Sequence, residues 1–454
     1  MHMLMPVLAK FIVDEYPSDA AVSVAVPAVA DGFGCILAGA SSEVAMRLAE
    51  SLPGQGAGWS SLFGTGKSIT PSYAALINAA AGHAYDLDDW EEPGNTHPTI
   101  VILPALLAAA SVAADRGVIC SGSDLLAAYC VGTEIIMRTG EAITLSHYER
   151  GFHATATLGA IGAAAASARL LGLDETAVSH ALGLAASQAT GYTLQFGTNA
   201  KPLQAGWAAR TGLEAACMAA AGITSNPDTL TSARGFAGLM GVHDEDRLAM
   251  MTTRLGRPWA LDEYGLVLKP WPSCAYTHRA MTAAAALHPA IAGSIRQISQ
   301  IKVTMVDFHY AILPFHDPRN RTEALFSLPA CVAQMLVTGQ MTLADGENNF
   351  WDHGDVAFLI SRTEVAANSP QRPEYNYDPE QPDILQVRLQ DGTILQEAVP
   401  YPLGAAQNPM SQTQLAEKFS GCTKLPISAF DALLEWHECR DVMEFFANVG
   451  GRDS

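Results

Sequence analysis

Basic side chains are scarce in this sequence, which has 26 Lys and Arg against 46 Asp and Glu and a net charge of −20. Nucleic acids and anionic membrane surfaces attract proteins mainly through positive charge. The composition therefore argues against both as partners. An acidic chain that binds an acidic substrate needs cations placed locally, so each Lys, Arg or His in apolar surroundings is a candidate for such a contact.

Long hydrophobic runs and cysteine motifs are also missing. The longest apolar run, residues 99–114, contains Pro104 and is shorter than the ~20 residues of a membrane span. Residues 1–14 lack the basic segment and the cleavage site of a signal peptide. The eight cysteines include no CxxC pair, and no His/Cys set has the spacing of a zinc site. We expect a cytoplasmic protein with reduced thiols and with no metal or other cofactor.

Charged residues make up only 16% of the chain, whereas hydrophobic residues reach 49%. Residues 71–221 have an almost continuous helical pattern rich in Ala, Leu and Gly, and small residues let helices pack closely. Alternating apolar residues then predict strands at 298–306, 384–389 and 394–399. Helical patterns lie between these strands, at 323–337, and after them, at 411–419 and 429–447.

This order of patterns predicts a mainly α protein in which the chain leaves a helical domain, builds a second domain and returns. We expect a large all-helical domain built from both chain ends, residues 1–267 and 405–454. We expect a smaller α/β lid domain between them, residues 268–404.

The densest group of acids follows His83 in the stretch His83-Ala-Tyr-Asp-Leu-Asp-Asp89, which continues to Thr96-His97-Pro98. Carboxylates beside an imidazole can hold a divalent cation, tune a histidine for acid–base chemistry, or cap a helix. Asp88 or Asp89 could simply cap a helix end. A metal site made of Asp86, Asp88, Asp89 and His97 is the main rival to acid–base chemistry.

Four later stretches carry further candidates. Tyr148 and His153 precede a predicted helix, whose amino end favours an anion. Lys201 lies in Lys-Pro-Leu-Gln204 before an apolar helix, where burial would lower its pKa and its charge could pair with a carboxylate. The third stretch contains Cys274 with His278, and the loop Asp317-Pro-Arg319-Asn-Arg321 follows as a possible carboxylate clamp.

Taken in order, four motifs resemble the MmgE/PrpD family, which includes 2-methylcitrate dehydratase, cis-aconitate decarboxylase and iminodisuccinate epimerase. The motifs are His-Ala-Tyr-Asp-Leu-Asp-Asp with Thr-His-Pro, Gly-Phe-His-Ala-Thr, Lys-Pro-Leu-Gln-Ala-Gly and Lys-Pro-Trp-Pro-Ser-Cys-Ala-Tyr-Thr-His. The resemblance covers nearly the whole chain. It implies a helical domain, a lid, a homodimer, and an active site between the two domains.

By the same resemblance, Asp86, His97, His153 and Lys201 match pocket residues and His278 matches a lid-side histidine. We hypothesise that Lys201 and either Tyr148 or His153 are opposing bases, that His97 and His278 bind carboxylates, and that Asp86 orients a histidine. We add Gln204, Arg319 and Asp89 as predicted substrate-binding residues.

The sequence also departs from the decarboxylase pattern. Gln204 stands where that branch has His, Ala330 stands where it has a pocket Tyr, and one residue is inserted between Asp89 and His97. We therefore expect a cofactor-independent enzyme that moves a proton next to a carboxylate of a small di- or tricarboxylate, by epimerisation of the iminodisuccinate type. The first alternative is a hydro-lyase like 2-methylcitrate dehydratase. Cis-aconitate decarboxylation, a metal-dependent lyase and a non-catalytic carboxylate-binding protein stay open.

Overall fold

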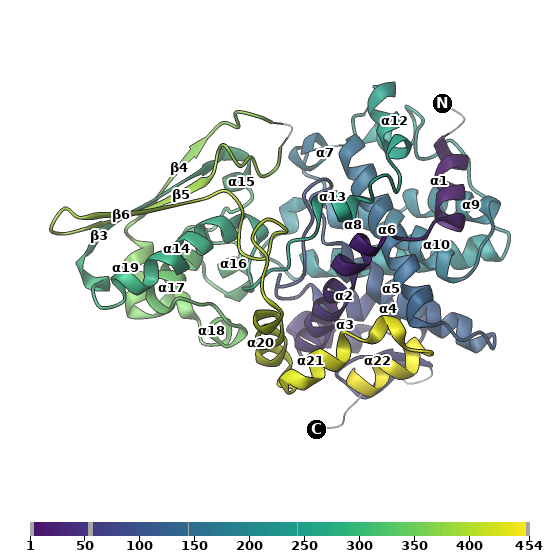
Figure 1. Ribbon diagram of the computed structural model, residues 1–454, viewed down its shortest axis with the longest axis horizontal. Helices are drawn as coiled ribbons and strands as arrows, with labels where there is room; N and C mark the ends of the chain where they lie inside the picture. The colour runs from purple at the N-terminus through teal and green to yellow at the C-terminus, as the bar shows by residue number, and fades with distance from the viewer. Residues whose placement is uncertain (1–3, 53–57, 144, 243, 374, 451–454) are drawn as a thin grey trace.

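The computed structural model describes residues 4–52, 58–143, 145–242, 244–373 and 375–450, so the ends of the predicted helical domain, 1–3 and 451–454, lie outside it. A larger helical part and a smaller part with a sheet lie side by side (Figure 1). The helical part holds both ends of the chain.

The first thirteen helices build the helical part around apolar segments that are buried on nearly every side. They are α1 Leu4–Asp14, α2 Asp19–Gly39, α3 Glu43–Ser51, α4 Pro71–Gly82, α5 Pro98–Asp115, α6 Gly122–Ile143, α7 Leu145–Glu149, α8 Ala154–Leu170, α9 Glu175–Ala186, α10 Ala200–Ala220, α11 Phe236–Leu239, α12 Glu245–Thr253 and α13 Ala260–Tyr264. A short antiparallel hairpin, β1 Ser60–Leu62 and β2 Lys67–Ile69, lies between α3 and α4.

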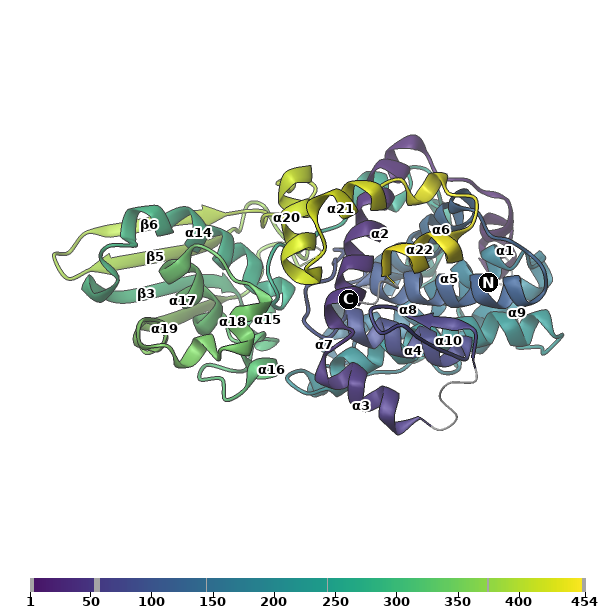
Figure 2. The ribbon, with the colours of Figure 1, turned by 90° about the horizontal axis from the view of Figure 1, so that it is seen from below.

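The smaller part has a four-stranded sheet in the order β4-β3-β5-β6, in which only β3 and β4 are parallel. Its strands are β3 Ile298–Val306, β4 Thr363–Asn368, β5 Asp383–Leu389 and β6 Ile394–Val399. Helices α14 and α17 pack together on one face of it (Figure 2). The helices are α14 His278–Ile291, α15 Asp307–Ala311, α16 Arg321–Ala324, α17 Leu328–Thr338, α18 Leu343–Glu347 and α19 Gly354–Ile360.

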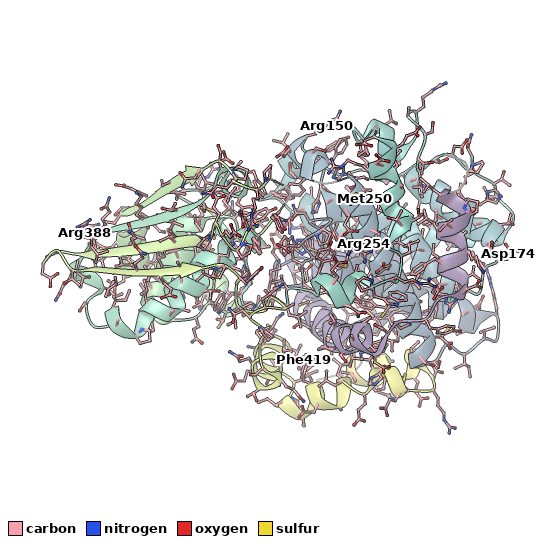
Figure 3. All side chains as sticks on the ribbon, turned by 45° about the horizontal axis from the view of Figure 1, so that its top comes forward. Arg150, Asp174, Met250, Arg254, Arg388 and Phe419 are labelled. Carbon is pink, nitrogen blue, oxygen red and sulfur yellow. The ribbon has the colours of Figure 1, made fainter. Side chains whose placement is uncertain are left out.

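After β6 the chain returns to the helical part as α20 Gln412–Thr423, α21 Ile427–Leu433 and α22 Val442–Gly450. Phe419 of α20 packs on α2, where a Cβ added at Gly34 would lie 2.7 Å from the phenyl ring (Figure 3). The two chain segments that connect the parts lie side by side. The Leu268 N–H of the first segment donates to the Gly404 carbonyl of the second at 3.0 Å. We keep 268–404 as the proposed limits of the lid domain.

The mainly α fold class is confirmed, with differences in detail. Strands β3 and β6 have the predicted bounds, and β5 begins one residue earlier. Strand β4, Thr-Glu-Val-Ala-Ala-Asn, was missed because only Thr363 and Val365 favour a strand. The β1–β2 hairpin was also missed, and the helix predicted at 429–447 is broken between α21 and α22.

Helices α2 and α5 are long and apolar enough to cross a membrane by length and composition alone. Most of the apolar 18-residue segment of each helix is buried inside the protein, 61% of it in α2 and 83% of it in α5. Core helices of soluble proteins have this property. The cytoplasmic location remains a prediction.

Helix α10 lies directly against α4 because Gly206 has no side chain. A Cβ added there would lie 2.4 Å from the backbone oxygen of Leu76. This close approach matters for the site, since α10 begins beside Lys201 and α4 ends at His83.

We predict that Gly206→Ala destabilises the fold by about 1–3 kcal/mol, because α10 must move away from a rigid backbone. Gly421→Ala is the matched control, since a Cβ there meets nothing within 4 Å in α20. A helical Gly→Ala change without a clash should stabilise by up to about 1 kcal/mol. Urea unfolding of both variants measures this difference, and equal stabilities would contradict the close packing.

Candidate active site

A cavity lies between the helical part and the first residues of the proposed lid. Eight lining residues come from the helical part: Asp86, Trp90, Asn95, His97, Tyr148, His153, Phe196 and Lys201. Cys274, Ala275, Tyr276 and Phe326 line it from the lid side. All five residues predicted to be catalytic are thus brought together, although their roles stay predictions. The free space is about 20 Å³, which is about what one water molecule needs.

Three helices present their amino ends to this cavity. His97 is the N-cap of α5, His153 is the N-cap of α8, and Lys201 lies in the first turn of α10. Neither histidine side chain caps its helix. Because unsatisfied N–H groups and helix dipoles favour negative charge, this convergence suits an anionic ligand.

Asp86 is held between two lysines. Lys201 Nζ lies 3.0 Å from Oδ2, and Lys269 Nζ lies 2.6 Å from Oδ1 and also donates to the Asp86 carbonyl. All three side chains are buried. Burial alone would raise the pKa of Asp86, but the two ammonium groups outweigh it and hold the pKa well below the ordinary value. Asp86 is therefore a carboxylate that fixes both cations.

Lys201 also contacts a second buried pair, His83 and Asp88. Its Nζ lies 2.9 Å from His83 Nε2, while His83 Nδ1 lies 2.8 Å from Asp88 Oδ2. Burial lowers the pKa of His83, so the ring is neutral and donates from Nδ1 to the carboxylate. Its Nε2 then accepts from Lys201, and the ammonium is fixed from two sides.

His97 is a second neutral imidazole at the cavity. Its Nδ1 lies 2.8 Å from the Asp89 carbonyl and 3.2 Å from the Asp88 carboxylate, so Nδ1 carries the proton. Burial, helped by the charge of Lys269, lowers its pKa to about 3. The unprotonated Nε2 faces Asp86 Oδ1 at 3.8 Å. A lone pair is thus available at neutral pH.

His153 is oriented by Gln204. The Gln204 amide is fixed by Tyr192, whose N–H donates to Oε1 and whose carbonyl accepts from Nε2, both at 3.2 Å. Oε1 also lies 2.7 Å from His153 Nδ1, so Nδ1 must carry a proton. Burial lowers the pKa of His153 well below its ordinary value, with a further contribution from Lys201. His153 is therefore neutral, with a free lone pair on Nε2.

Four residues predicted to bind substrate do not line the cavity. Gln204 acts on the ring of His153 instead. Asp89 accepts from the N–H and hydroxyl of Thr99 at the start of α5, and burial raises its pKa to about 8. The capping alternative for this acid is the better description.

His278 and Arg319 are also corrected. The two ring nitrogens of His278 face the carbonyls of Cys274 and Trp271 at 3.1 and 3.2 Å. The ring therefore contacts the backbone of the turn that precedes its own helix. The Arg319 side chain is 82% exposed and pairs with Glu323. The spacing of residues in the sequence does not show which way the side chains of His278 and Arg319 point.

The sequence analysis missed His83, Lys269 and Tyr276 as members of the site. Lys269 opens the Lys-Pro-Trp-Pro motif, but its reach back to Asp86 joins residues 183 positions apart. His83 lies at the start of the acidic motif, but the sequence analysis chose only the aspartates and His97 of that motif as candidate site residues. The signal for Lys269 in the sequence was its position directly before a segment that two prolines hold extended, Lys269-Pro-Trp-Pro.

A cation could be considered at His83, Asp86, Asp88 and His97, whose ligand atoms lie within 4.8 Å of one another. Asp88 Oδ1 has no hydrogen-bond partner among the described residues. However, both oxygens of Asp86 already contact ammonium groups. A divalent ion would add charge beside two lysines, which is unfavourable in a buried site. The donor set fits a metal poorly.

Comparison with known sequences agrees with this geometry. The sequence model of the MmgE/PrpD N-terminal domain matches residues 7–248, and that of the MmgE/PrpD C-terminal domain matches residues 271–439. The chain belongs to the MmgE/PrpD family. The C-terminal match extends past the proposed lid and includes the returning helices α20 and α21.

Similar proteins are enzymes of the same family. Cis-aconitate decarboxylase of Mus musculus is 30% identical over 364 residues, covering 77% of this chain and 71% of the relative. That of Aspergillus terreus is 28% identical over 433 residues, covering 89% and 85%. The cis-aconitate decarboxylase-like protein oryM of Aspergillus oryzae is 27% identical over 473 residues, covering 98% and 96%. This MmgE/PrpD protein is thus related to lyases that act on a small tricarboxylate.

We predict that Gln204→Glu raises the pKa of His153 by about 1–3 units, because a carboxylate beside Nδ1–H favours the imidazolium. NMR titration of histidine-labelled protein measures the shift. Gln334→Glu is the control, since Gln334 is also buried but bonds Thr338 in α17. A His153 titration that is unchanged in Gln204→Glu would contradict the orienting contact.

Proposed function

We propose that this MmgE/PrpD protein abstracts a proton from a carbon next to a carboxylate of a small di- or tricarboxylate, without a cofactor. The observation that supports this most is the grouping of Lys201 with two neutral, oriented histidines in one cavity. A base that is neutral at neutral pH and close to a cation can take a proton while the cation stabilises the enolate formed.

The cavity divides this work among its residues. We assign Lys201, with the amino ends of α5, α8 and α10, to the carboxylate next to the reacting carbon. Deprotonation of that carbon moves negative charge onto this carboxylate, so a fixed cation there stabilises the transition state more than the ground state. His153 Nε2 is the proposed base, and the unprotonated His97 Nε2 is proposed to accept a second proton or a hydrogen bond from a substrate hydroxyl.

Tyr148 is proposed as the group that returns a proton. Burial raises its pKa well above the ordinary value, so the phenol keeps its proton at neutral pH. A protonated phenol suits the acid, whereas the sequence analysis had offered Lys201 with either Tyr148 or His153 as the opposing bases. Proton removal by His153 and return from Tyr148 would give epimerisation of the iminodisuccinate type if the two groups face opposite sides of the carbon.

Lysis through an enolate of the same kind is the second candidate: decarboxylation would leave the electron pair of the broken C–C bond as an enolate next to a carboxylate, which Tyr148 would protonate. The similar proteins named above are cis-aconitate decarboxylases, which favours loss of carbon dioxide over epimerisation. Dehydration of a 2-methylcitrate type would use the same proton removal, with the neighbouring hydroxyl protonated by Tyr148 and lost as water. The homodimer expected from the family also stays a proposal. Leu194, two residues before the cavity residue Phe196, is 91% exposed, so its apolar side chain is available for contact with a partner subunit.

Proton NMR in deuterium oxide with iminodisuccinate, 2-methylcitrate, citrate and cis-aconitate tests this proposal. Loss of an α-proton signal with an unchanged skeleton indicates epimerisation, a new vinylic signal from 2-methylcitrate or citrate indicates dehydration, and itaconate-like vinylic signals from cis-aconitate indicate decarboxylation. Binding of these compounds without any exchange or turnover would point to a non-catalytic carboxylate-binding protein.

We predict that Lys201→Ala lowers the rate of exchange or turnover by at least about 100-fold, because the enolate loses its cation. Lys302→Ala is the control, since Lys302 is an exposed lysine of β3 and should leave the rate unchanged. Substantial turnover by Lys201→Ala would contradict the assigned role.

We predict that dialysis against EDTA leaves the same rate unchanged, because lysines occupy both oxygens of Asp86. Loss of activity that added Mg²⁺, Mn²⁺ or Zn²⁺ restores would support the metal-dependent alternative and overturn this prediction.

A further inference from the structure

Asn95 occupies a strained turn that the proposed mechanism leaves without a role. Its φ is +56°, in the left-handed region that non-glycine residues rarely adopt. The turn is held by Glu91, whose carboxylate accepts from Gly94 N–H, Thr96 N–H and the Thr96 hydroxyl. The backbone of Asn95 is therefore fixed from both sides, which fixes where its side chain points.

The orientation of the Asn95 amide follows from Trp90. The indole Nε1–H can only donate, and it lies 2.7 Å from the amide oxygen of Asn95. The NH2 group must then point the other way. Asn95 lines the cavity and is only 5% exposed, and its Nδ2 makes no hydrogen bond of normal geometry with any described residue, although the phenols of Tyr148 and Tyr276 lie near it. A buried donor without a partner costs about 1–3 kcal/mol, so it needs an explanation.

The surroundings of this donor differ from those of Lys201. Trp90, Tyr148 and Tyr276 line the same cavity. Burial raises the pKa of both phenols, and the nearby Asn95 amide opposes this only in part. These groups are neutral, whereas Lys201 and Asp86 are charged and contact each other. Trp90 and Tyr276 already donate to Asn95 and Asn376, so the neutral donors left for a ligand are the Asn95 NH2 and the Tyr148 hydroxyl, in addition to the Lys201 cation.

We propose that the side-chain NH2 of Asn95 donates a hydrogen bond to the substrate carboxylate that is remote from the reacting carbon. This rests on the proposed function, because the carboxylate next to the reacting carbon must stay with Lys201 and the base. Asn95 thereby selects a second carboxylate, so the enzyme takes di- or tricarboxylates and rejects monocarboxylates. The Trp90 indole is a positioning group that holds the amide in the donating orientation.

Two ligands that cannot react test this assignment by isothermal titration calorimetry. Succinate carries two carboxylates, and succinamate replaces one of them with a carboxamide. We expect the unmodified protein to prefer succinate. Asn95→Asp keeps the acceptor for Trp90 but loses the donor and adds negative charge. It should weaken succinate binding by about 10- to 100-fold and reverse the preference toward succinamate, whose NH2 can donate to the new carboxylate.

A second variant and a control separate recognition from folding. Asn95→Gly tolerates the positive φ and should weaken succinate about tenfold without any preference for the carboxamide. Asn78→Asp is the control, because the Asn78 amide is equally buried but bonds Phe63 and Ser61 away from the cavity. It should lower the thermal midpoint and leave both affinities unchanged.

The outcomes distinguish this inference from the proposed function. If the unmodified protein binds neither ligand and exchanges no proton with the substrate panel, the proposed function fails and the role of Asn95 fails with it. If the unmodified protein binds succinate and both Asn95 variants bind it equally well, only the role of Asn95 is overturned. A reversed preference in Asn95→Asp alone supports it, since lost stability cannot exchange one ligand for the other.

Discussion

The site depends on one buried interaction, the carboxylate of Asp86 held between the ammonium groups of Lys201 and Lys269. An isolated charge in such an interior would be prohibitively costly, and two lysines side by side would repel each other. Asp86 relieves both problems and links α10 to the segment that leads into the lid. Its φ of +52° shows that the backbone accepts strain to place this carboxylate.

The neutral histidines follow from that arrangement. Lysines and burial both lower the pKa values of His83, His97 and His153, so the three rings are neutral at neutral pH. Each ring then needs a partner that accepts from Nδ1, and the fold supplies Asp88, the Asp89 carbonyl and Gln204 respectively. The three histidines are therefore available as bases and add no further positive charge to the site. This is the property that proton abstraction beside an anionic substrate requires.

The sequence predicted much of this arrangement, and the rest fails for physical reasons. Helical periodicity and strand alternation located the two parts, and the ordered motifs brought Asp86, His97, His153 and Lys201 together. Direction was not predictable: Arg319 turns to solvent and His278 to its own backbone, although both lie in suggestive motifs. Lys269 was missed because its partner is distant in sequence. The tautomer of His153 depends on Tyr192, which has no sequence signal at all.

The proposed chemistry is common to each of the reactions considered for this chain. Once a carbanion forms next to a carboxylate held by Lys201, its fate depends on which group lies opposite the base and on what the substrate can expel. Tyr148 is the proposed proton donor, a hydroxyl on the neighbouring carbon can leave as water, and loss of carbon dioxide from a carboxylate would itself generate the carbanion. Residues that only hold the remote end of the substrate, as we infer for Asn95, decide which of these substrates enters. On the proposed function, substrate choice and reaction type are therefore set by the neutral side chains that line the cavity, while Lys201 and the neutral histidines supply the proton transfer that the reactions share.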